Sequence, residues 1–187
     1  MKTIDVSRIA KEPDQRLAFL EDFTLFSKDD RAALAESIVV LAPKLSAILD
    51  ALYDHLLSYD DTRRAFLGPH GEMDPNYIAI RKEHLTEWLL RISTAREDGR
   101  SLASYLIEVG RRHTAGAGDH QRAVPPRYMV ALTSFIQTAL WTALFDLLPD
   151  QPAKVRRFGL AWNKVLVIQL ELFLKTIAPQ WPRWDEG

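Results

Sequence analysis

The sequence contains no cysteine among its 187 residues. This absence excludes disulfides, iron–sulfur clusters and every metal site built on thiolates. It is compatible with a reducing compartment, and we expect a cytoplasmic protein. Any metal would have to be held by histidine, carboxylate or main-chain ligands.

Long hydrophobic runs are also missing. The N-terminal stretch MKTIDVSRIAKEPDQ carries charges every few residues and no apolar core, so it does not resemble a signal peptide. The apolar run VLVIQLELFL is interrupted by Gln169 and Glu171. We therefore expect no membrane span. The formal net charge of -1 gives no electrostatic reason to expect nucleic acid or an anionic membrane as a partner.

Strand signals are nearly absent, because apolar residues recur at intervals of three and four rather than two. The pattern predicts an all-α fold and a single domain over residues 1–187. Ser27 is expected to cap a helix, Pro43 to start a new one, and Asp60 or Asp61 to cap a short piece. The expected helices cover residues 13–23, 27–41, 44–59, 60–67, 74–94, 99–114, 125–148 and 153–178. This pattern alone does not choose between four-helix bundles and other helical folds.

His113 is the histidine with the most informative surroundings. Leu102, Leu106, Val109 and His113 are spaced by four, three and four residues, which places the imidazole on an apolar helix face. Gly110 lacks a side chain nearby, so another group can approach closely. A metal ligand is one interpretation of this pattern. The other is a charged histidine that stabilises a helix C-terminus.

Two further residues were weighed in the same way. Tyr53 lies one position off an apolar stripe, where it is either a core-edge residue or a donor to a bound ligand. His84 is expected to be a surface or partly buried histidine. A chelate from His113, Asp119 and His120 is a weak alternative, because a glycine-rich loop is a poor rigid site. The paired Glu-x-x-His motif of di-iron bundles and the His-Glu-x-x-His motif of zinc proteases are absent.

Four stretches in order resemble the protoglobin family, which is related to the sensor domain of globin-coupled sensors. They are LYDHLLSYDDTRRAF (52–66), YLIEVGRRH (105–113), VPPRYMVAL (124–132) and AWNKVLVIQL (161–170). The resemblance covers about residues 15–178. It implies a globin-like fold with an extra N-terminal helix, and haem b (iron protoporphyrin IX) as the cofactor.

The resemblance also implies a role for particular residues. His113 would be the proximal iron ligand, and Tyr53 the distal tyrosine. Phe66 would pack on the haem, and Leu85 would occupy the distal position on the long helix expected over residues 74–94. The remaining cofactor-binding residues would be Leu52, Val109, Met129, Leu132 and Ile136. The three- and four-residue spacing of the last three supports one helix face independently.

The chain departs from the family pattern at several positions. Archaeal members carry Trp where Leu52 stands and Phe where Leu85 stands, so we expect a roomier distal side. Some members carry a second histidine where Thr114 stands. The N-terminal segment looks shorter than in archaeal members, which puts full burial of the haem in question.

The main functional hypothesis is reversible binding of a diatomic gas (O₂, CO or NO) at a haem iron. One alternative is haem-based redox catalysis, such as NO dioxygenation or peroxidase-like turnover. Another is a gas sensor, for which we expect a separate partner protein because the chain has no room for an output domain. A haem-free helical interaction module is the third. The two long C-terminal helices are candidates for a homodimer interface.

Overall fold

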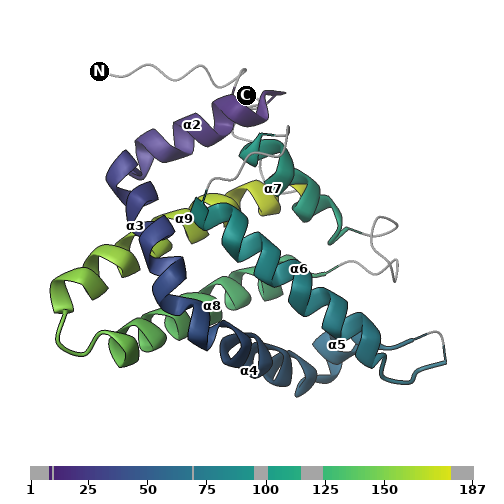
Figure 1. Ribbon diagram of the computed structural model, residues 1–187. Coiled ribbons are helices and arrows are strands. Elements are labelled where there is room, and N and C mark those ends of the chain that lie inside the picture. Colours follow the sequence, from purple (N-terminus) through teal and green to yellow (C-terminus); the bar gives the residue numbers. More distant parts are fainter. Residues whose placement is uncertain (1–8, 10, 69, 95–100, 115–123, 178–187) are drawn as a thin grey trace.

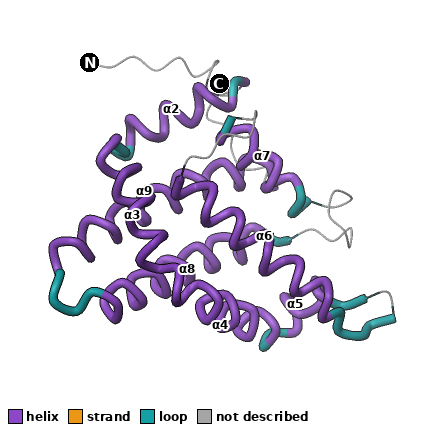
Figure 2. Tube along the Cα trace, in the orientation of Figure 1, coloured by secondary structure: helices purple, strands orange, loops and turns teal. Residues whose placement is uncertain are grey.

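The computed structural model describes residues 9, 11–68, 70–94, 101–114 and 124–177 (Figure 1). The predicted all-α class is confirmed, because the described part of the chain contains helices and only one isolated antiparallel bridge, between Leu67 and Met73. The long helices cross one another in a layered arrangement, and short connections join most of them (Figure 2). The helices are α2 (Pro13–Phe23), α3 (Lys28–Leu41), η1 (Ala42–Lys44), α4 (Leu45–Leu57), α5 (Asp60–Arg63), η2 (Arg64–Phe66), α6 (Pro75–Thr94), α7 (Leu102–Arg111), α8 (Pro126–Leu147) and α9 (Pro152–Ile177).

The expected helix starts are mostly confirmed by their capping chemistry. The Ser27 hydroxyl accepts a hydrogen bond from the Asp30 amide at 3.3 Å, and the Asp30 carboxylate accepts one from the Ser27 amide at 2.8 Å. This reciprocal pair satisfies two amides at the start of α3. Pro126 and Pro152 occupy first-turn positions of α8 and α9, where a missing N–H needs no partner.

Two local expectations were wrong. Tyr59, and not an aspartate, is the N-cap of α5, and Asp60 is already inside the helix. The carboxylates therefore act from the first turn, where they face the positive end of the helix dipole. Helix α7 ends at Arg111 rather than at residue 114. The proposed chelate involving Asp119 and His120 lies outside the described residues.

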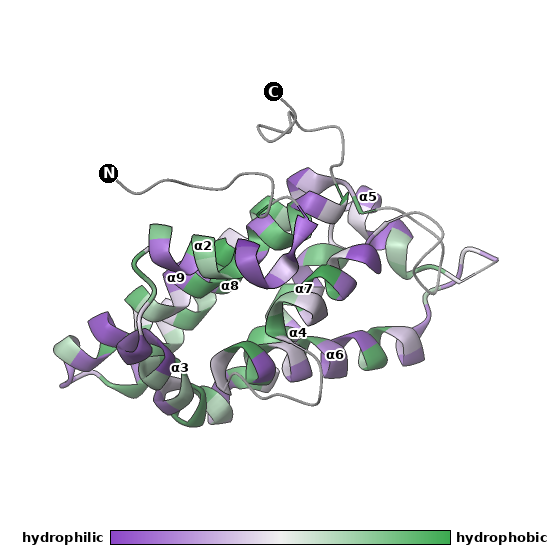
Figure 3. Cartoon of the chain, turned by 90° about the horizontal axis from the view of Figure 1, so that it is seen from above, coloured by the Kyte–Doolittle hydropathy of each residue, from purple (hydrophilic) through white to green (hydrophobic). Residues whose placement is uncertain are grey.

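Helix α9 is the central element of the core. It packs against α3, α7 and α8, and its side chains Phe158, Trp162 and Leu166 are fully buried. The Trp162 indole donates a hydrogen bond to the Ser37 hydroxyl at 2.8 Å, so this buried polar group is satisfied across α9 and α3. Hydrophobic and hydrophilic residues alternate along each helix, as expected for helices with one face in a core (Figure 3).

Two helical stretches, Lys28–Leu57 and Pro126–Leu147, are long and apolar enough to cross a membrane by length and composition. We had expected no segment of this kind. In the structure the first stretch is divided by the 3-10 turn at Ala42–Lys44, and both contribute buried residues to the core cluster. Apolar residues of both stretches therefore pack in the core of this domain.

Candidate functional site

A cavity of about 680 Å³ lies between α4, η2 and α6 on one side and α7, α8 and α9 on the other. This volume is within the usual range for sites that bind a cofactor or a drug-sized ligand, about 300–1,000 Å³. All nine residues singled out from the sequence line this one cavity. They are Leu52, Tyr53, Phe66, Leu85, Val109, His113, Met129, Leu132 and Ile136.

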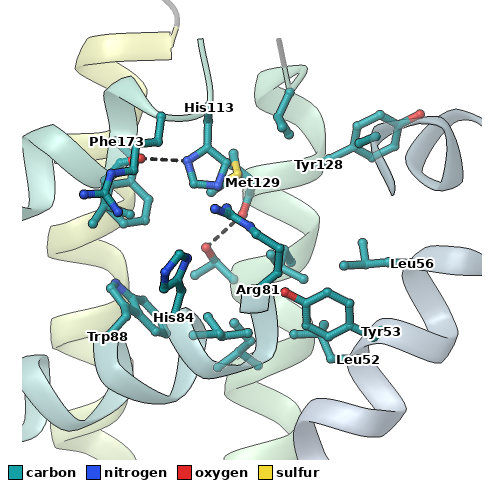
Figure 4. A pocket seen from close by; sticks show the side chains of 18 of the residues that line it. Leu52, Tyr53, Leu56, Arg81, His84, Trp88, His113, Tyr128, Met129 and Phe173 are labelled. Atoms are coloured by element: carbon teal, nitrogen blue, oxygen red, sulfur yellow. Dashed lines mark hydrogen bonds between the residues drawn. The ribbon is translucent and has the colours of Figure 1, made fainter. Parts of the chain in front are cut away.

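His113 extends into the cavity from just beyond the end of α7 (Figure 4). Its amide donates to the Gly110 carbonyl at 3.0 Å, and its carbonyl accepts from the Val124 amide at 2.9 Å. The ring stacks on Phe173 of α9 with the ring centroids 6.3 Å apart. These contacts hold His113 through α7, through the segment that precedes α8, and through α9.

The hydrogen bond of the His113 ring determines which nitrogen is available to a ligand. Nδ1 lies 2.8 Å from the Val109 carbonyl oxygen, which can only accept, so Nδ1 carries the proton. The lone pair of a neutral ring is then on Nε2. Burial lowers the pKa of His113, and the nearby Arg81 and Arg112 charges lower it further against the opposing effect of the Val109 hydrogen bond. The site therefore favours a neutral imidazole with a free nitrogen, the form that binds a metal.

Tyr53 of α4 also lines the cavity, on the side away from His113 in the view of Figure 4. Its side chain is buried, and burial raises the pKa of the Tyr53 hydroxyl to about 12. The hydroxyl consequently stays protonated at neutral pH and can act as a hydrogen-bond donor. Phe66 packs edge-on against the Tyr53 ring with the centroids 5.6 Å apart, which joins the two predicted residues directly.

The remaining predicted residues supply apolar walls. Met129 and Ile136 of α8 are buried, and Leu132 between them is half-buried. Leu52 from α4 is fully buried, and Leu85 of α6 is half-buried. An apolar lining with a few polar groups at defined places is typical of a cofactor pocket.

Sequence analysis missed the polar face that α6 presents to this cavity. Arg81, Trp88 and Arg91 all line it, at spacings of seven and three residues on one helix face, and Gln169 faces it from α9. The indole nitrogen of Trp88 and the amide oxygen of Gln169 are buried with no hydrogen-bond partner in the described part of the chain. Buried polar atoms without partners are costly, so their presence on a cavity wall indicates a site that receives a polar or ordered ligand.

His84 is exposed, in agreement with the surface or partly buried position expected for it, and it also lines the cavity. Within the described residues, no cluster of three or more histidine, aspartate or glutamate side chains could hold a metal ion.

Gly110 confirms the close approach expected at that position. A Cβ atom placed on it would lie 3.2 Å from the Cα atom of Phe173 in α9 and would also meet the Thr176 side chain. Glycine thus allows α7 to lie directly on α9. Because His113 follows Gly110 by three residues, this approach positions the imidazole as well.

The fold and the histidine-lined cavity together define a globin-like helical protein, and comparison with known proteins agrees. The Protoglobin family model matches residues 13–180. The chain therefore belongs to the protoglobin family. No curated protein matches it in sequence.

Solved structures that match include the globin domain of the Geobacter sulfurreducens globin-coupled sensor. It shares 17% sequence identity with this chain, the TM-score is 0.70, and the match covers 86% of this chain and 97% of that domain. At this level of identity the match supports the fold, so the globin-like architecture is confirmed.

The contact at Gly110 yields a test of how the site is built. Gly110→Ala should lower the free energy of unfolding by about 1–3 kcal/mol, because the Phe173 backbone cannot move aside as a flexible side chain can. It should also weaken binding of haemin (ferric haem), measured by titrating the apoprotein.

Gly159→Ala is the matched control. An added Cβ there meets the half-exposed ring of Trp141 at the contact between α8 and α9, away from His113. This variant should lose stability without a comparable loss of haemin affinity. Equal losses of haemin affinity in the two variants would show that Gly110 has no particular role in positioning His113.

Proposed function

We propose that this protein binds haem b, that His113 would hold its iron, and that the loaded protein binds a diatomic gas reversibly. The observation that carries the proposal is the neutral His113 imidazole, which has its free Nε2 on the wall of a cavity large enough for a cofactor. Membership of the protoglobin family supports the same cofactor class.

The cavity residues fit haem by their chemistry. The Val109 carbonyl holds the His113 ring in the tautomer that exposes Nε2, which is the arrangement usual for iron-binding histidines. Met129, Leu132 and Ile136 offer an apolar wall for a flat aromatic ring system. His84, which is exposed and lines the cavity, would meet a carboxylate group of the cofactor near solvent.

When bound, haem iron would supply reversible binding of O₂, CO or NO, and bound O₂ would carry more partial negative charge than bound CO. The protonated Tyr53 hydroxyl is a neutral donor that faces this space. A hydrogen bond of this type is worth about 1.5–3 kcal/mol. Tyr53 is therefore expected to favour O₂ over CO.

The proposal is tested by titrating haemin into the apoprotein and recording the visible spectrum. We expect one haemin per chain and a sharp Soret band that shifts on reduction and again on addition of CO. The His113→Ala variant should give a degraded spectrum. A featureless titration, or a spectrum unchanged by the substitution, would contradict haem binding or the ligand assignment respectively.

The role of Tyr53 gives a second prediction. Tyr53→Phe should speed O₂ dissociation by about tenfold or more, because bound O₂ loses the hydrogen bond from the hydroxyl. CO affinity should barely change, because CO gains little from that donor. Stopped-flow replacement of O₂ by CO measures the first quantity, and CO titration measures the second. Equal effects on both gases would show that Tyr53 acts by shape and not by hydrogen bonding.

Gas binding can serve transport, sensing or redox turnover, and one observation favours sensing. One of the matching solved structures is the globin domain of a globin-coupled sensor. Turnover of NO or peroxide with a reductant would instead favour the redox alternative, and failure to bind haem would favour a helical interaction module.

We also propose that α8 and α9 form a homodimer interface. Four large apolar side chains on these two helices are at least 44% exposed, namely Val130, Phe145, Leu160 and Val167. Burial of such residues is the usual source of stability in a symmetric interface.

Light scattering should give the mass of a dimer, and Phe145→Glu combined with Val167→Glu should shift it toward the monomer. The control Val39→Glu changes a more exposed apolar residue on α3 and should leave the mass unchanged. A monomer in the unmodified protein would remove the proposal.

A further inference from the structure

Arg81 is one of three arginines that line the cavity, together with Arg91 and Arg112. Arg81 comes from α6, it is half-buried, and its guanidinium carbon lies 5.9 Å from the centroid of the Tyr77 ring. Figure 4 shows its guanidinium group between His113 and Tyr53. Arg81 also acts electrostatically on both of these residues, which places its charge near each of them.

No carboxylate in the described part of the chain pairs with the charge of Arg81. Within the described residues, Arg81 forms no ion pair, whereas the half-buried Arg16 is paired with Glu171 and Arg31 with Glu21. The carboxylate that lines the same cavity, Glu87, is exposed at its rim. Since a guanidinium group remains protonated at all accessible pH values, it needs an anion when water is displaced from around it.

The neighbourhood of Arg81 supplies a second donor of the right kind. The Tyr53 hydroxyl faces the same space and stays protonated at neutral pH. A small anion between His113 and these two groups could accept from a charged N–H and a neutral O–H at once. Hydrogen bonds that involve an ionised partner are about twice as strong as neutral ones.

We propose that Arg81 and Tyr53 form an anion-binding position inside the cavity, which makes small monovalent anions such as fluoride, azide and nitrite preferred ligands of the ferric protein. The inference rests on the proposed haem function and adds to it a class of ligand. It assigns Arg81 as the residue that selects anions over neutral ligands of similar size.

The test is equilibrium titration of the ferric haem-loaded protein with fluoride and azide, with neutral imidazole as the reference ligand. Arg81→Met keeps the length of the side chain and removes its charge. It should weaken fluoride and azide binding by about tenfold or more, with little change for imidazole. Arg81→Lys should restore part of the anion affinity, because it returns the charge without the forked donor geometry.

Arg112→Met is the matched control, because Arg112 lines the same cavity and carries the same charge but is exposed. Loss of an exposed charge should weaken anion binding by at most about fivefold. Equal weakening by Arg81→Met and Arg112→Met would overturn the proposal. It would show that anions respond to the overall positive charge around the cavity and not to Arg81 in particular. Unchanged anion affinity in Arg81→Met would overturn it outright.

A carboxylate of the cofactor is the other possible source of the anion, and the same variants distinguish it. Haemin and its dimethyl ester are compared for their rate of loss to an acceptor apoglobin. If Arg81→Met speeds loss of haemin but not of the ester, Arg81 holds the cofactor and the proposal is wrong. If neither rate responds and anion affinity falls, the proposal stands.

The outcome for this proposal is separate from that for haem binding itself. A protein that forms the Soret band and binds CO, but whose anion affinity ignores Arg81, keeps the proposed function and loses only this inference. Absence of the Soret band in the unmodified protein would overturn both.

Discussion

The approach of α7 to α9 at Gly110 is the contact on which the site depends. It brings the α7 backbone against Phe173, and the turn that follows places the His113 ring on the same phenyl group. The Val109 carbonyl then fixes the ring nitrogen that remains available. One small residue thus links the packing of the central helix to the chemistry of a cavity on its surface. A larger residue would have to separate the two helices before it could be accommodated.

The cavity itself carries features that a well-packed core avoids. The Trp88 indole nitrogen and the Gln169 amide oxygen are buried without partners in the described part of the chain, and a guanidinium group stands among apolar side chains. Each feature costs free energy in the empty protein. A bound cofactor and its ligand would offset part of that cost, so haem binding should stabilise the fold as well as supply a function.

Much of this arrangement could be predicted from the sequence because it depends on local patterns. Helix starts follow from Ser27 and from prolines, and the three- and four-residue spacing places Met129, Leu132 and Ile136 on one face. The gathering of nine separate residues around one cavity follows from the family resemblance together with that spacing. The individual functions of these residues remain predictions.

Other features could not be predicted because they depend on tertiary contacts. In the sequence, Arg81 cannot be distinguished from the charged residues Lys82 and Glu83 beside it. Only the packing of α6 in the folded chain places it near His113 and Tyr53. The early end of α7 was also missed, since His113 continues the helical spacing although its amide bonds to Gly110 in a tight turn.

The most direct test of this account is the CO spectrum of the reduced, haem-loaded His113→Gly variant, with and without added imidazole. Removal of the ring leaves a space that free imidazole can enter. The account predicts a weakened or displaced Soret band in the variant, and recovery of the unmodified protein's spectrum when imidazole is added. A variant that shows the unmodified spectrum without imidazole would contradict the assignment of His113 as the iron ligand.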